Sequence, residues 1–185
     1  MPMGPFTLMD MLGIDVCADV GEYLYSEYGD RMTPARLFEK LLEEGRLGEK
    51  SGAGFYDHPG GESDEVHQMI EDLQSSGDVA SGTSFSVERV MYPLINEAAQ
   101  CVLENVATMT DIDMAMVAGT GMTYDGDRVG PLVGGDRNGM DEVEEKLREL
   151  EDEFGPRFRP ARPLRLRVRA KHLGVKSGKG FYEHT

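Results

Sequence analysis

The chain has 185 residues, 39% of them hydrophobic, so it is long enough to bury a core in one domain or in two small ones. Its formal net charge of -15 argues against nucleic acid and anionic membranes as partners. No apolar run approaches the roughly 18 residues of a membrane span, no secretory signal layout is present, and two cysteines argue against a disulfide framework, so we expect a cytoplasmic protein.

The amino-terminal part contains two predicted helices and a glycine-rich arm. Ala18 to Tyr28 is predicted as a helix that Gly29 ends with a left-handed cap. A second helix is predicted to begin with Thr33 as its cap and to end at Gly45. The segment from Lys50 to His58 has too many glycines for a helix, so we expect an extended arm.

Residues 59–84 are predicted to be a linker, because clusters of glycine, proline and serine flank one short helical candidate, Asp64 to Leu73. A long helix is predicted next, at Val87 to Val106, where apolar residues recur at the spacing of a helix. Pro93 lies inside this pattern, so the helix either begins after Val90 or carries a kink.

Three more helices are predicted. Thr110-Asp111-Ile112-Asp113 resembles a capping box, and the helix that it begins ends at Gly119-Thr120-Gly121. Asp141 to Glu153 is a charged helix with a thin apolar stripe, formed by Val143, Leu147 and Leu150. Leu164 to Arg169 alternates as a strand would, but its repeat partner has a helical pattern, and we favour a helix.

The chain repeats itself with a shift of 126 residues. Lys50-Ser51-Gly52-Ala53-Gly54-Phe55-Tyr56-Asp57-His58 returns as Lys176-Ser177-Gly178-Lys179-Gly180-Phe181-Tyr182-Glu183-His184. Residues 4–58 match residues 130–184 at 21 of 55 positions, where unrelated sequences would match at roughly three. The long helix has no counterpart ahead of the first copy. The sequence therefore predicts an all-α protein with a partial first helical repeat (1–58), a linker (59–84) and a complete second repeat (85–185).

Charge is distributed unevenly. Residues 1–156 carry 10 basic and 33 acidic side chains (net -23), and residues 157–185 carry 9 basic and 1 acidic (net +8). Only 6 of the 19 cationic residues are lysine, so we favour adaptation to high salt over an ordinary acidic cytosolic protein. The basic stretch from Arg157 to Lys179 either binds phosphates or an acidic neighbour, or is a solvated face.

The sequence lacks the signatures of a self-sufficient active site. Gly119-Thr120-Gly121 has no third glycine and follows a helix, so it is no dinucleotide fingerprint, and Lys50-Ser51 precedes its glycines, so it is no phosphate loop. The four histidines show no metal-ligand spacing with Cys17 and Cys101, so we expect no metal site. Glu97 lies in an apolar helix and either bonds to a helix terminus, which we favour, or takes part in catalysis.

Several motifs together resemble one family. Pro2-Met3-Gly4-Pro5-Phe6 with Asp10 and Gly13, Asn96-Glu97-Ala98, Asp111-Ile112-Asp113 and the two Lys-x-Gly-x-Gly-Phe-Tyr arms are similar to the C-terminal domain of the L-3-hydroxyacyl-CoA dehydrogenases. The resemblance covers nearly the whole chain. It implies two tandem repeats of the 6-phosphogluconate-dehydrogenase-C-terminal-like helical domain, duplicated as in the fused fatty acid β-oxidation enzymes, with the first repeat truncated.

In that family a Rossmann domain binds NAD and supplies the catalytic histidine and glutamate, while the helical domain closes over acyl-CoA and mediates dimerisation. The resemblance thus implies a substrate-binding and dimerisation domain that binds no cofactor itself, is inactive alone, forms a homo-oligomer and needs a Rossmann-type NAD-binding domain or chain. It carries over no catalytic residue and places the substrate-binding candidates Met3, Gly4, Pro5 and Phe6 near the inter-domain cleft. The arm residues form a structural motif: Lys50, Gly52, Gly54, Phe55, Tyr56, Lys176, Gly178, Gly180, Phe181 and Tyr182. A structural oligomerisation module and a stand-alone acyl-CoA binding protein are the alternatives.

Overall fold

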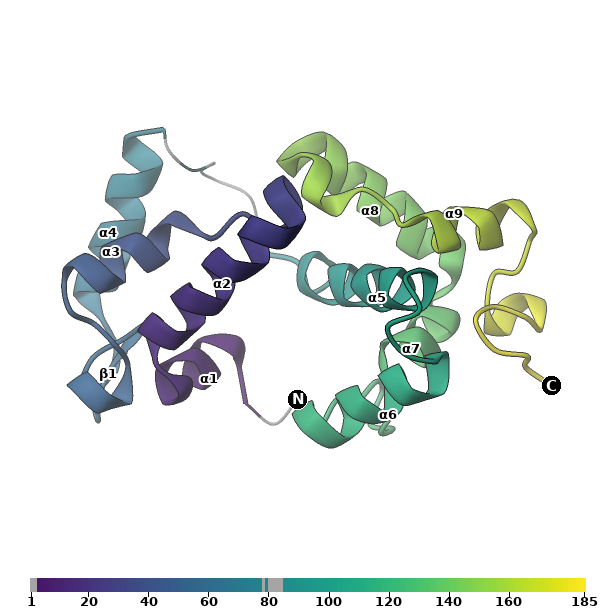
Figure 1. The fold of residues 1–185 in the computed structure, drawn as a ribbon, viewed down its shortest axis with the longest axis horizontal. Helices are drawn as coiled ribbons and strands as arrows, with labels where there is room; N and C mark the ends of the chain where they lie inside the picture. Colours follow the sequence, from purple (N-terminus) through teal and green to yellow (C-terminus); the bar gives the residue numbers. More distant parts are fainter. Residues whose placement is uncertain (1–2, 78, 80–84) are drawn as a thin grey trace. The chain divides into compact units, whose positions relative to one another are not determined.

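The structure is a computed structural model that describes residues 3–77, 79 and 85–185 (Figure 1). Within these residues the α-helices are α1 (Pro5–Leu12), α2 (Ile14–Tyr28), α3 (Arg36–Glu43), α4 (Asp64–Ser75), α5 (Glu88–Leu103), α6 (Met109–Thr120), α7 (Pro131–Asn138), α8 (Met140–Phe154) and α9 (Arg162–Arg169). Short 3-10 helices are η1 (Gly29–Met32), η2 (Glu49–Ser51), η3 (Pro156–Phe158) and η4 (Val175–Ser177). One antiparallel hairpin pairs β1 (Tyr56–Asp57) with β2 (Gly61–Glu62). The predicted all-α fold class is confirmed.

The described residues form two compact units, the first up to residue 79 and the second from residue 85. Helices α1, α2 and α3 of the first unit have the same lengths as α7, α8 and α9 of the second, and each begins and ends 126 residues earlier. The same shift relates η2 to η4. The described part of the first unit holds no such counterpart of α5 or α6.

The core of the second unit is a set of apolar side chains from α5, α7, α8, the start of α9 and the carboxyl-terminal arm. It comprises Ile95, Ala98, Ala99, Leu132, Met140, Val143, Leu147, Ala161, Leu164 and Phe181. The predicted stripe of α8 is confirmed, because its three members are buried. The helix at α9 is confirmed as well, so the repeat was a better guide there than the alternating pattern.

The core of the first unit is smaller, with Ile14, Leu41, Phe55 and Val66 at its centre. Val66 belongs to α4, so the segment predicted as a linker contributes a helix to this core. Arg46, 6% exposed, strengthens the connection: its guanidinium donates to the Asp57 carboxyl at 2.6 Å, to the Ser63 hydroxyl at 2.9 Å and to the Glu65 carboxyl at 2.8 Å.

Some predicted boundaries in the first unit were wrong. Helix α2 begins at Ile14 rather than Ala18, and the cap of α3 is Ala35 rather than Thr33, whose hydroxyl instead donates to the Asp30 carbonyl. Gly29 and Gly45 do adopt the positive φ angles expected of helix ends. The arm from Lys50 to His58 is not extended; bridges from Gly48 to Ala53 and from Ala53 to Asp57 fold it into a closed loop.

In the second unit, α5 begins at Glu88 and contains Pro93, so the alternative of a later start was wrong. The capping box of α6 begins at Thr108, two residues before the predicted one, because the Thr108 hydroxyl accepts from the Asp111 amide. The helix ends at Gly121, as predicted, and this glycine takes the left-handed conformation.

A buried carboxyl group holds the closed loop of each unit in place. Asp10, 1% exposed, accepts from the amides of Phe55 at 2.8 Å and Tyr56 at 3.0 Å and lies 2.8 Å from Nε2 of His58. Since a buried polar group is costly unless its hydrogen bonds are made, these contacts join the loop to α1.

The second unit repeats this arrangement. Asp136, fully buried, accepts from the amides of Phe181 at 2.8 Å and Tyr182 at 2.9 Å and lies 2.7 Å from Nε2 of His184. Glycine is required beside the carboxyl group, because a Cβ at Gly54 or Gly180 would overlap the aspartate side chain.

We expect Gly180→Ala to lower the free energy of unfolding of the second unit by about 3 kcal/mol, since the added methyl group displaces Asp136 from its donors. Gly119→Ala is the matched control, because a Cβ there meets nothing within 4 Å inside α6. It should raise stability by up to about 1 kcal/mol. Urea denaturation of both variants tests this, and equal effects would contradict the role of the carboxyl group.

Candidate functional site

The predicted substrate-binding residues lie at the start of α1. Gly4 is the N-cap and Pro5 the first helical residue, while Met3 and Phe6 are 37% and 49% exposed. The Phe6 ring lies 4.6 Å from the Phe55 ring. These residues are accessible, but no ligand contact tests their role, which stays a prediction.

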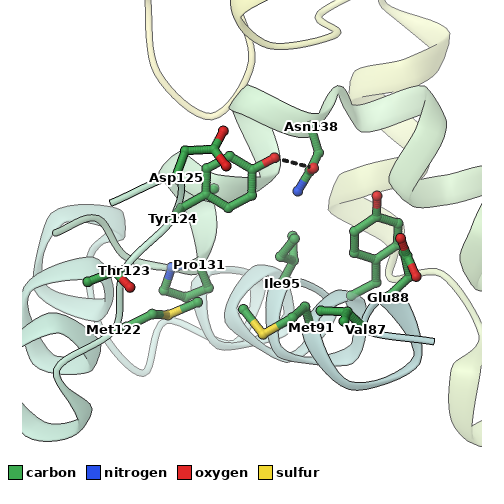
Figure 2. Close-up of a pocket in the computed structure, with 12 residues that line it drawn as sticks. Val87, Glu88, Met91, Ile95, Met122, Thr123, Tyr124, Asp125, Pro131 and Asn138 are labelled. Atoms are coloured by element: carbon green, nitrogen blue, oxygen red, sulfur yellow. Dashed lines mark hydrogen bonds between the residues drawn. The ribbon is translucent and has the colours of Figure 1, made fainter. Parts of the chain in front are cut away.

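The corresponding segment of the second unit, Val129 to Leu132, borders two hollows. Pro131 lines a pocket of about 350 Å³ that α5 and the segment between α6 and α7 enclose. Val129 and Gly130 line a wider groove along α6. Figure 2 shows the pocket, with Met91 and Ile95 of α5 on one side and Tyr124 and Asn138 on the other.

The chemistry of this pocket suits a small uncharged group. Its walls are largely apolar, and the Tyr124 hydroxyl donates to Oδ1 of Asn138 at 2.5 Å (Figure 2). Burial raises the pKa of the Tyr124 hydroxyl and of Tyr92, so both remain neutral donors near pH 7. Glu88 and Asp125 add carboxyl groups to the lining, which disfavours phosphate.

Asp113 is a buried carboxyl group of the second unit that contacts two other segments of the chain. It is 8% exposed and accepts from the amides of Leu132 at 2.8 Å and Val133 at 3.2 Å and from the Tyr182 hydroxyl at 2.8 Å. Burial raises the pKa of Asp113, against the effect of these donors. Burial, followed by the bond to Asp113, also raises the pKa of Tyr182. The bonds from Leu132 and Val133 anchor the first turn of α7, and the bond from Tyr182 holds the carboxyl-terminal arm, so the carboxyl group has a structural role.

The arm residues are structural too. Lys50 contacts both carboxyl oxygens of Asp15, at 2.5 and 2.6 Å, and its hydrogen bond lowers the pKa of Asp15. Lys176 contacts Asp141 at 2.6 Å in the same way. Gly52 and Gly178 take the left-handed conformation that ends η2 and η4. Phe55 and Phe181 are core residues, and Tyr56 and Tyr182 follow them with amides bonded to the buried aspartates.

The chain does not fit NAD at its one glycine-rich candidate. Gly119-Thr120-Gly121 forms the carboxyl end of α6, where the carbonyl dipoles repel a pyrophosphate that a helix amino terminus would attract. In the described ranges, no group of three or more histidine, cysteine, aspartate or glutamate side chains could hold a metal ion. Among the helices described, none is long and apolar enough to cross a bilayer.

Sequence reasoning missed three polar residues that organise the units. Asn96, next to Glu97 in α5, bonds to the start of another helix: its Nδ2 donates to the Arg159 carbonyl at 3.0 Å, and its Oδ1 accepts from the Ala161 amide at 2.7 Å. Asp113 lies in the predicted capping box, but its carboxyl group bonds to α7 and to Tyr182. The repeat did not indicate a role for Arg46, because the matching residue of the second copy is His172.

The two arm tyrosines offer a matched pair. Tyr182→Phe removes a bond to a buried carboxyl group and should lower the free energy of unfolding of the second unit by about 1–3 kcal/mol. Tyr56→Phe should change stability by less than about 0.5 kcal/mol, because the Tyr56 hydroxyl has no partner in the described part of the chain. Denaturant titration measures both, and equal losses would contradict this assignment.

Comparison with known proteins identifies a family model and relatives that match the chain. The family model for the 3-hydroxyacyl-CoA dehydrogenase C-terminal domain matches residues 1–58 and 85–184. The chain is 33% identical over 192 residues to the fatty acid oxidation complex subunit alpha of Idiomarina loihiensis, and 34% identical over 191 residues to that of Shewanella loihica. Each alignment covers 98% of this chain but 25% of the relative, so the chain spans about a quarter of these proteins.

Two solved structures are also similar to the chain. The (S)-3-hydroxybutyryl-CoA dehydrogenase of Ralstonia eutropha is 32% identical with a TM-score of 0.52, over 68% of this chain and 44% of that one. The 3-hydroxybutyryl-CoA dehydrogenase of Escherichia coli shares the fold, with a TM-score of 0.72 at 23% identity, over 91% of this chain and 52% of that one. Because the family model matches most of its residues, the chain belongs to the family of 3-hydroxyacyl-CoA dehydrogenase C-terminal domains, as the sequence resemblance predicted.

Proposed function

We propose that the chain is the substrate-binding and dimerisation domain of an NAD-dependent 3-hydroxyacyl-CoA dehydrogenase of cytoplasmic fatty acid β-oxidation. The family match carries this proposal, and the names of the relatives support it. The NAD and the catalytic acid and base come from a Rossmann-type domain or chain.

The contacts of the candidate acid–base side chains support the proposal that catalysis belongs to another domain. The two groups that would serve best in acid–base chemistry, Asp113 and Tyr182, bond to each other and to α7. The imidazoles of His58 and His184 bond to the buried aspartates. What the domain supplies is orientation of the acyl-CoA and exclusion of water, which lower a barrier without contributing a reactive group.

The alternative of a stand-alone acyl-CoA binding protein depended on the basic stretch at its carboxyl end. Much of that stretch bonds within the chain. Arg159 contacts Glu151 at 2.8 Å, the Arg167 guanidinium lies 3.9 Å from the centre of the Phe181 ring, and Lys179 contacts Glu183 at 3.1 Å. Arg162 and Arg169 are exposed and are the better candidates for phosphate contacts.

The chain alone should show no NADH consumption with acetoacetyl-CoA, in dilute buffer or in about 2 M KCl, where an acidic surface is screened. Adding the Rossmann part of a fatty acid oxidation complex subunit alpha should produce turnover. Activity of the pure chain would contradict the proposed function. It would also be contradicted if the mixture showed no turnover while calorimetry showed tight acetoacetyl-CoA binding to the chain, and if Arg162→Ala and Arg169→Ala abolished that binding.

The predicted substrate-binding residues are tested in the same mixture. Met3→Glu places a like charge beside the anionic CoA and should raise KM about tenfold with little change in kcat. Leu12→Glu, at the other end of α1 and 54% exposed, is the control and should leave KM within twofold. Equal effects of the two variants would remove these residues from the site.

A further inference from the structure

Helix α7 lacks a side chain where it faces the pocket between α5 and the segment that joins α6 to α7. Gly134 is buried and lines this pocket, which has a volume of about 350 Å³. A Cβ at Gly134 would meet only Cδ2 of Tyr124, at 3.7 Å, so close packing does not require a glycine there. The first copy has Leu8 at the matching position. Since glycine inside a helix costs stability, the pocket is kept open by a residue that the helix itself disfavours.

The amide of Asn138 gives the pocket a directed hydrogen-bond donor. Its Oδ1 accepts from the Tyr124 hydroxyl at 2.5 Å, and this bond leaves the Nδ2 group to donate elsewhere. Figure 2 shows Nδ2 pointing towards the side of the pocket where Ile95 lies. Within the described part of the chain this nitrogen has no partner. A bound molecule that satisfies it must present an acceptor, such as a carbonyl oxygen.

The rest of the lining selects against charge on the bound molecule. Among the described residues that line the pocket none is cationic, whereas Glu88 and Asp125 are acidic and exposed. An anion would be repelled there, but a neutral N–H group could donate to a carboxylate at the rim. Met91, Ile95 and Met122 form an apolar wall that suits a hydrocarbon body.

We propose that this pocket is a binding site for a small neutral carboxamide with a compact apolar body. The carbonyl oxygen of the ligand accepts from Nδ2 of Asn138, and its hydrocarbon part packs against Met91 and Ile95. Its N–H group faces the carboxyl group of Glu88 or water at the rim. The first copy has Leu12 at the position of Asn138, so the donor belongs to the second copy.

Three probes with the same hydrocarbon ring and different head groups test this site: cyclohexanecarboxamide, cyclohexanecarboxylate and cyclohexylmethylammonium. Each is titrated into the full chain labelled at its methionine methyl groups, and the NMR signals are followed. The carboxamide should shift Met91 and Met122 with a Kd of about 1 mM, while Met9 and Met69 in the first unit do not respond. The carboxylate should bind about tenfold more weakly, because its charge must be buried, and the ammonium should also bind more weakly, because it offers no acceptor to Asn138.

Variants of the polar pair separate the donor from its support. Asn138→Leu introduces the residue of the first copy and should weaken carboxamide binding about tenfold. Tyr124→Phe keeps the amide but removes the bond that orients it, so binding should weaken about threefold.

Gly134→Ala narrows the pocket and should weaken carboxamide binding about threefold, although it raises the midpoint of thermal unfolding by about 2–4 °C. Gly119→Ala is the matched control. It also replaces a helical glycine, but a Cβ there meets nothing within 4 Å and Gly119 does not line the pocket, so the affinity should stay unchanged.

Absence of shifts at Met91 and Met122 with all three probes would overturn the proposal. So would binding of the carboxylate or the ammonium as tight as that of the carboxamide, or carboxamide binding that Asn138→Leu leaves unchanged. If Asn138→Leu loses the native methionine signals, unchanged carboxamide binding by both Tyr124→Phe and Gly134→Ala would overturn it instead. No dehydrogenase activity is measured, so failure here is distinct from failure of the proposed function.

Discussion

Each unit of this protein is organised around one buried carboxyl group. Asp10 and Asp136 have almost no exposed surface, and each accepts from two consecutive backbone amides and approaches one imidazole. Neither the helix that carries the aspartate nor the glycine loop can move away without leaving a buried polar group unsatisfied. This cost explains why the aspartate, the loop glycines and the histidine all recur at a spacing of 126 residues.

The contacts of the two buried aspartates are alike, but the elements packed around them differ between the units. In the second unit, α5 and α6 add a larger core and two polar side chains, so the first turn of α7 is buried and fully bonded. In the first unit, α4 and the Arg46 cluster add contacts on another side, and the first turn of α1 stays open. The substrate-binding residues predicted from the sequence lie at this open turn.

Much of the fold could be predicted because helical periodicity and the repeat reinforced each other. The repeat decided the helix at α9, where the alternating arginines alone favoured a strand. Long-range pairings were not predictable. Nothing local shows that Asp113 reaches the amides of Leu132 and Val133, or that Arg46 binds α4. The predicted helix cap at Thr33 was wrong because the Thr33 hydroxyl donates to the Asp30 carbonyl in the preceding turn. The role of Met3, Gly4, Pro5 and Phe6 in substrate binding stays a prediction, because no contact within the chain tests it.

Residue-resolved hydrogen exchange tests the account most directly. The amides of Phe55, Tyr56, Phe181 and Tyr182 should all exchange slowly, because both units retain the aspartate contacts. The amides of Leu132 and Val133 should be slow as well, while those of Phe6 and Thr7 exchange at nearly the rate of an unstructured peptide. Fast exchange at Phe55 and Tyr56, or equal protection at Phe6 and Leu132, would contradict the view that one interaction builds both units and that only the second is covered.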